Sequence, residues 1–184
     1  GAHGLSAMSP PNSNMSKVWE LVEWLKPVLA DVSNLPFYFY DSPAISGTKL
    51  DMADFLEMAY NELPSLVGLQ FNNADLAMLK KCLTIQGGKF DILFGVDEML
   101  ILGLDQGCKG AVGSTYNFAA PIYHKLIEAY ESGDREEIAE RIKHTYDEQW
   151  TLRVDPNETD PARREVREYQ RRDFLDSIAT ALRR

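Results

Sequence analysis

The sequence has few of the features that mark secreted, membrane-spanning or nucleic-acid-binding proteins. Its 2 cysteines in 184 residues are too few for a disulfide scaffold, and we expect Cys82 and Cys108 to be buried free thiols. No stretch approaches the roughly 18 uninterrupted apolar residues of a membrane span, and no secretory signal is visible. Lys and Arg number 19 against 28 Asp and Glu, a net charge of −9 that does not suit a phosphate-backbone binder. We expect a cytoplasmic protein that binds neither nucleic acid nor membrane.

Motifs for common cofactors and metals are also missing. No Gly-x-Gly-x-x-Gly loop follows an expected strand, and no Gly-x-x-x-x-Gly-Lys loop occurs. The histidines, His3, His124 and His144, are scattered, and no two have the spacing of metal ligands. No Gly-x-Ser-x-Gly sequence indicates a serine hydrolase. We therefore expect no cofactor and no metal.

What the sequence does contain is an alternation, repeated five times, of short apolar runs with segments of helical periodicity. Strands separated by helices pair in parallel through right-handed crossovers, which predicts an α/β fold. The pattern fits either a (β/α) barrel or a doubly wound sheet. Asn73 and Asp97 are suited to cap two of the helices, and Pro121 to begin another. The expected strands are residues 4–9, 36–40, 66–71, 90–94 and 110–114.

Charge and composition change near residue 151. Residues 1–150 carry 11 basic and 21 acidic side chains, a net of −10, whereas residues 151–184 carry 8 and 7, a net of +1. Every basic residue of the second segment is Arg, and a Pro-bounded polar stretch, residues 154–161, lies near its start. We expect a folded body over residues 1–150, with a last helix from about residue 134 to 150, and an Arg-rich helical tail over residues 151–184.

Polar residues stand where the expected strands end. In parallel α/β folds the carboxyl ends of the strands meet at one rim, which is where functional residues gather. Amides, hydroxyls and carboxylates match the hydroxyl groups of a sugar-like ligand. The strand-end residues are Tyr40-Asp41, Gln70-Phe71-Asn72, Gly95-Val96-Asp97-Glu98 and Ser114-Thr115-Tyr116-Asn117.

Four blocks at these strand ends resemble N-acetylneuraminate lyases, in the order and spacing of that family. The wider family includes dihydrodipicolinate synthase, and the resemblance covers about residues 1–150. It implies a (β/α)8 barrel, usually tetrameric, and a class I aldolase that cleaves N-acetylneuraminate to N-acetylmannosamine and pyruvate. The blocks are residues 37–50, 68–71, 94–98 and 110–117.

The resemblance also implies roles for individual residues. A strand lysine in this family forms a Schiff base with the ketone of pyruvate, and the protonated imine accepts the electrons of the broken carbon–carbon bond. Tyr40 matches the tyrosine that relays a proton. The remaining matches are to positions that hold the substrate, and with Asn72 they make up the expected substrate-binding set: Asn72, Gly95, Asp97, Glu98 and Ser114.

The chain departs from the family pattern at the central catalytic position. Gln70 stands where the family has its Schiff-base lysine, and an amide nitrogen is not nucleophilic. Lys49, Lys80 and Lys81 lie in a loop and on a helix, so they do not replace it easily. Two interpretations stay open: an engineered or recorded substitution that traps substrate, or a natural lyase-like protein without the chemistry.

The chain is also short for the fold that it resembles. Residues 1–6 resemble the family's fourth strand, so we expect about five βα units of a barrel that typically needs about 250 residues. Together with Gln70, this predicts little or no cleavage activity. The alternatives are a non-catalytic protein that binds a sugar acid or another subunit, and a homologue of dihydrodipicolinate synthase. The expected ligands are a sugar acid or pyruvate, and the expected assembly is a homo-oligomer.

Overall fold

A computed structural model describes residues 1–144 except for 12, 32–33, 134–136, 138–139 and 142–143. The chain divides into two compact units, residues 1–113 and 114–184. The expected tail over residues 151–184 lies outside the described residues, as does most of the expected helix from residue 134 to 150.

The first unit is built on a five-stranded sheet in which every pair of neighbours is parallel. The strands lie in chain order, β1-β2-β3-β4-β5, with no reversal of the kind that defines a doubly wound sheet. Since right-handed crossovers in one direction place every helix on the same face, this order selects the barrel-type alternative. The strands are β1 (Leu5–Ala7), β2 (Phe37–Asp41), β3 (Leu66–Phe71), β4 (Asp91–Phe94) and β5 (Gly110–Ala111).

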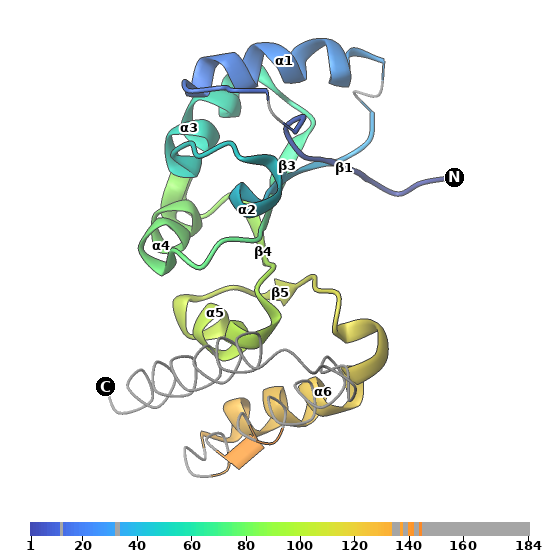
Figure 1. The fold of residues 1–184 in the computed structure, drawn as a ribbon, viewed down its shortest axis with the longest axis vertical. Coiled ribbons are helices and arrows are strands. Elements are labelled where there is room, and N and C mark those ends of the chain that lie inside the picture. Colours follow the sequence, from blue (N-terminus) through green and yellow to red (C-terminus); the bar gives the residue numbers. More distant parts are fainter. Residues whose placement is uncertain (12, 32–33, 134–136, 138–139, 142–143, 145–184) are drawn as a thin grey trace, which may run out of the picture. The chain divides into compact units, whose positions relative to one another are not determined.

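Helices follow each of these strands (Figure 1). In the first unit α3 packs against both α1 and α4, and α4 packs against α5. The second unit contains α6, whose Tyr116 and Tyr123 rings meet edge to face with centroids 4.4 Å apart. The helices are α1 (Val18–Ala30), α2 (Pro43–Ser46), α3 (Met52–Glu62), α4 (Leu76–Thr84), η1 (Ile85–Gly87), η2 (Asp97–Met99), α5 (Leu100–Gln106) and α6 (Tyr116–Ser132).

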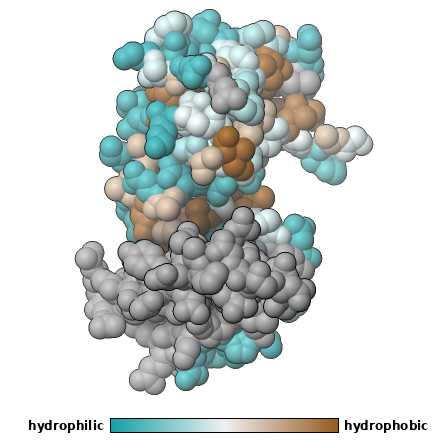
Figure 2. Space-filling view, viewed as in Figure 1, coloured by the Kyte–Doolittle hydropathy of each residue, from teal (hydrophilic) through white to brown (hydrophobic). Residues whose placement is uncertain are grey.

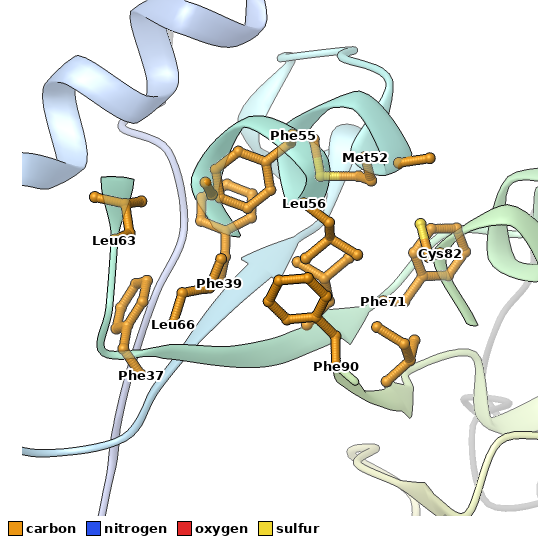
Figure 3. Packing of buried hydrophobic residues seen from close by; sticks show 14 of the residues in the cluster. Phe37, Phe39, Met52, Phe55, Leu56, Leu63, Leu66, Phe71, Cys82 and Phe90 are labelled. Carbon is orange, nitrogen blue, oxygen red and sulfur yellow. The ribbon is translucent and has the colours of Figure 1, made fainter. Parts of the chain in front are cut away.

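The core lies between one face of the sheet and the helices. Side chains alternate along β2, so Phe37 and Phe39 are buried under the helices while Tyr38 and Tyr40 on the opposite face are only half-buried. Phe39 packs on Phe55 of α3, with ring centroids 5.1 Å apart (Figure 3). Burying such rings removes a large apolar area from water, which is the main favourable term in folding.

Apolar side chains at the surface are few by comparison. In the view of Figure 2, hydrophobic residues form small patches separated by hydrophilic ones. Cys82 and Cys108 are buried free thiols, as expected. No helix among the described residues is both long enough and apolar enough to cross a membrane. In the part of the chain that the structure describes, the exposed large hydrophobic side chains are Trp19, Val28, Ile45, Met58 and Val112.

Three details of the predicted elements were wrong. The cap of α4 is Asp75, whose carboxylate accepts from Met78 N at 2.9 Å, and Asn73 instead accepts from Asp75 N at 3.0 Å. Asp97 does not cap its helix, because it lies inside the short η2 turn that precedes α5. Pro121 lies within α6, which begins five residues earlier at Tyr116, so it does not mark the start of the helix.

Gly68 of β3 allows two side chains to meet across the strand. It pairs with Tyr38 on one side and Asp91 on the other, and the Tyr38 hydroxyl donates to Asp91 Oδ2 at 2.8 Å. A Cβ at position 68 would lie 1.8 Å from Asp91 O and 2.9 Å from Tyr38 Cε1. Only glycine fits this crossing without displacing backbone.

We predict that Gly68→Ala lowers the free energy of unfolding by about 3 kcal/mol, because the methyl group overlaps a backbone oxygen. The matched control is Gly110→Ala, whose Cβ would meet only the end of the flexible Leu93 side chain at 3.0 Å. Urea unfolding followed by circular dichroism measures both. Equal losses for the two variants would contradict the proposed role of Gly68.

Candidate functional site at the carboxyl ends of the strands

Tyr40 and Gln70 are neighbours across the β2–β3 ladder. They form a paired position in the register, and Gln70 pairs in turn with Leu93 of β4. Both side chains are half-buried and lie on the face opposite the helix-covered core, where the alternation of each strand places them. In a barrel-type sheet this face is the interior. The structure therefore brings together two of the residues that the sequence singled out.

Asn72 connects the ends of these strands. Its backbone N–H donates to Asp41 O at 2.8 Å, which continues the β2–β3 pairing by one residue. Its side-chain Nδ2 donates to Tyr40 Oη at 3.1 Å and to Ser42 Oγ at 3.1 Å. A Cβ at Gly95 would lie 3.0 Å from both Cα and Cβ of Asn72, so glycine at the end of β4 leaves the space that Asn72 occupies. Tyr40, Ser42, Asn72 and Gly95 thus form one connected group.

Asp97 and Glu98 follow β4 in the η2 turn. Asp97 is 5% exposed, and its carboxylate lies against the backbone of Gly113, where an added Cβ would be 1.6 Å from Oδ1. Glu98 is half-buried. Ser114 begins the second compact unit and is exposed, with its carbonyl accepting from the Asn117 side chain at 3.0 Å.

Asp41 does not share the rim with Tyr40, contrary to the sequence-based expectation. Alternation along β2 puts Asp41 on the helix-covered face, where it is 4% exposed and its Oδ2 has no hydrogen-bond partner. Burial raises the pKa of the Asp41 carboxyl to about 6, and a hydrogen bond from the Asn73 side chain opposes part of the rise. The period of two that runs through Phe37, Phe39 and Asp41 could have revealed this placement.

Ser42 is the one residue of the connected group that sequence reasoning missed. It is 1% exposed, and its hydroxyl receives the second hydrogen bond from Asn72. It precedes Pro43 at the start of α2, a position that the sequence presents as an ordinary turn. Its distance of 30 residues from Asn72 along the chain leaves no local signal of the contact.

Lys49, Lys80 and Lys81 do not supply an amine at position 70, where the resemblance predicts the family lysine. Lys49 is exposed, Lys80 donates to Gln106 O at 3.2 Å, and Lys81 lies 3.8 Å from Asp51 Oδ2 on the helix side. The buried Cys82 is also on that side, and burial raises the pKa of its thiol to about 12, which keeps it protonated and unreactive. The interior face thus presents amide and hydroxyl groups that bind oxygen-rich ligands, with no nucleophilic amine beside Tyr40.

Among the described residues, no three or more His, Cys, Asp or Glu side chains are grouped so that they could hold a metal ion. His124 and His144 are exposed. The polar groups that meet at the ends of β2 and β3 are an amide, a phenol and an aliphatic hydroxyl, and η2 carries two carboxylates after the end of β4. This set is suited to hydrogen bonding with a small polar ligand.

A parallel sheet in strict chain order, with helices on one face and polar residues at the carboxyl ends of its strands, is part of a (β/α)8 barrel. The chain belongs to the Dihydrodipicolinate synthetase family, which matches residues 1–152. The resemblance found in the four sequence blocks is thereby confirmed at the level of the family.

Within this family the chain is similar to N-acetylneuraminate lyases. It is 36% identical over 135 residues to N-acetylneuraminate lyase of Danio rerio, and the matched region covers 73% of this chain and 44% of that protein. Among solved structures, N-acetylneuraminate lyase of Proteus mirabilis has 42% identity and a TM-score of 0.72, covering 74% of this chain and 46% of that one. The Aliivibrio salmonicida enzyme has 41% identity and a TM-score of 0.73, covering 76% and 46%. The chain thus spans less than half the length of these relatives.

We predict that Asp41→Asn stabilises the protein at neutral pH. The folded-state pKa of about 6 lies above the ordinary 3.8, so the folded state binds more protons and stability falls as pH rises from about 4 to 6. Above pH 6 the variant should gain roughly 3 kcal/mol over the parent, a gain that disappears near pH 4.

Thermal or urea unfolding of both proteins across pH 4 to 8 measures this gain. Asp105→Asn, at an exposed aspartate of α5, is the matched control and should change stability little at any pH. If the two proteins differed in stability by the same amount at every pH, this would contradict the raised pKa of the buried Asp41 carboxyl.

Proposed function

We propose that this chain is an N-acetylneuraminate lyase-like protein that binds a sugar acid or pyruvate without forming a Schiff base. The single observation that carries the proposal is Gln70. It lies beside Tyr40 on the interior face, where the resemblance expects the imine-forming lysine. The similarity to proteins named N-acetylneuraminate lyase supports the choice of ligand class.

The chemical reason is the difference between an amine and an amide. A lysine amine attacks a ketone carbon and, after loss of water, leaves a protonated imine that draws electrons from the neighbouring bond. The Gln70 nitrogen shares its lone pair with its own carbonyl, so it neither attacks nor titrates. It can still donate and accept hydrogen bonds, so binding does not require the lost chemistry.

The other site residues keep the roles that the resemblance implies, as part of the same proposal. Tyr40 supplies the hydroxyl nearest the reacting group of the ligand, and Gly95, Asp97 and Glu98 hold the hydroxylated chain of the sugar. Ser114 contributes a further substrate contact. The lyase-like part of the chain is residues 1–150. The protein is cytoplasmic and assembles as a homotetramer, as the resemblance to the family implies. Light scattering on the purified protein tests the number of subunits.

We predict that incubation with pyruvate and borohydride leaves the parent chain unmodified, because no amine stands at position 70. Gln70→Lys should gain the mass of one reduced pyruvate adduct, since its side chain would emerge beside Tyr40 on the interior face. Intact-protein mass spectrometry reads both results.

Gln86→Lys, which places the same new amine at an exposed position in η1, is the matched control and should remain unmodified. An adduct on the parent chain would show that another lysine forms the imine and would sink the proposal. An adduct of equal yield on both lysine variants would remove its specificity.

A further inference from the structure

Asn72 holds two hydroxyl groups with a single amide. Nδ2 carries two hydrogens, and it donates at 3.1 Å to Tyr40 Oη and at 3.1 Å to Ser42 Oγ. Asn72 is itself placed by two independent contacts: its backbone N–H donates to Asp41 O, and its Cβ fills the space that Gly95 leaves. The amide is therefore held in position between the ends of β2, β3 and β4.

This arrangement determines how Tyr40 uses its own proton. A phenol hydroxyl has one proton to donate and an oxygen that accepts. The oxygen of Tyr40 accepts from Asn72, and this is the only hydrogen bond that joins Tyr40 to another described side chain. The hydroxyl proton of Tyr40 is therefore left to donate to a ligand on the interior face, beside the paired residue Gln70.

Gln70 offers the second half of the same feature. Its amide has no hydrogen-bond partner among the described residues, so its two N–H groups are free to donate. Tyr40 and Gln70 occupy a paired position on adjacent parallel strands, with side chains on the same face. Two neutral donors side by side match an oxygen atom with two lone pairs, such as a ketone or a carboxylate.

We propose that Asn72 is a positioning residue that turns the Tyr40 proton toward the ligand, so that Tyr40 and Gln70 together bind the keto or carboxylate oxygen of a 2-keto acid. This rests on the proposed function, and it adds how a keto acid is held when no imine forms. Ser42 completes the device, because its buried hydroxyl fixes the second Asn72 hydrogen and keeps the amide from rotating.

The decisive variant is Asn72→Asp, which has nearly the same shape but only acceptors. Its carboxylate would accept hydrogen bonds from the Tyr40 and Ser42 hydroxyls, so Tyr40 would have no hydrogen left to donate to a ligand. We expect its affinity for pyruvate, measured by NMR titration, to fall about tenfold or more. Asn61→Asp, an exposed site on α3 with the same charge change, should bind as the parent does.

A double-mutant cycle with Tyr40→Phe separates positioning from charge repulsion. A direct effect of the new carboxylate on pyruvate would persist in the Tyr40→Phe background. If Asn72 acts through Tyr40, the same Asn72→Asp change costs less than about threefold in affinity there. Equal losses in both backgrounds, or full affinity of Asn72→Asp, would overturn the proposal.

A measurement without ligand distinguishes failure of this inference from failure of the proposed function. The two side-chain amide hydrogens of Asn72, identified by their absence in Asn72→Asp, should exchange with water several-fold more slowly than those of exposed Asn61. Tyr40→Phe should speed that exchange. Slow exchange with no pyruvate binding would contradict the proposed function and the keto-acid part of this inference. Exchange as fast as that of Asn61 would overturn the positioning role, whatever the protein binds.

Discussion

The register of three parallel strands is the constraint on which the rest of the described structure depends. Tyr40 pairs with Gln70, and Gln70 with Leu93, so one shared row of side chains runs across β2, β3 and β4. Since alternate residues point to opposite faces, a shift of one residue in any strand would move its row to the other face. The same register buries Phe39 and Phe71 under the helices and leaves Tyr40 and Gln70 on the interior face.

Glycines make the close approaches that the register creates. Gly68 lets Tyr38 reach Asp91 across β3, Gly95 makes room for Asn72, and Gly113 makes room for the carboxylate of Asp97. At each of these three glycines, backbone or short side-chain atoms occupy the space that a Cβ would need, so larger residues fit there poorly. The arrangement of polar groups at the strand ends is therefore a property of the backbone as much as of the polar residues themselves.

The residue at position 70 bears on two properties that an aldolase combines, covalent activation of the ligand and recognition of the ligand. Covalent activation needs an amine at the centre of the interior face, whereas recognition needs donors and acceptors around it. In the proposed function, Gln70 lacks the first property and still supplies the second. The neighbouring Tyr40, Asn72 and Ser42 form a hydrogen-bonded group that does not depend on a lysine.

Much of the fold could be predicted from the sequence because its signals are local. The alternation of apolar runs with helical periodicity predicted the parallel sheet, and the four sequence blocks predicted the barrel family, which the match over residues 1–152 confirmed. The choice between barrel and doubly wound sheet needed the strand order, which no single segment encodes. The cap of α4 was misplaced because Asn73 and Asp75 are both good capping residues two positions apart.

The site was predictable in part. Tyr40, Gln70 and Asn72 were found from strand ends and resemblance, and the structure brings them together. Asp41 was assigned to the wrong face because the strand-end argument ignored alternation, and Ser42 was missed because its partner lies 30 residues away. The roles of Gly95, Asp97, Glu98 and Ser114 toward a substrate remain predictions.

The central claim is that this interior face binds a keto acid without covalent chemistry. NMR of the unmodified protein with pyruvate isotope-labelled at its keto carbon tests it most directly. The account predicts a saturable change in that resonance, with the carbon still a ketone, and the same change weakened in Asn72→Asp. An imine resonance in the bound state, or no saturable change at all, would contradict it.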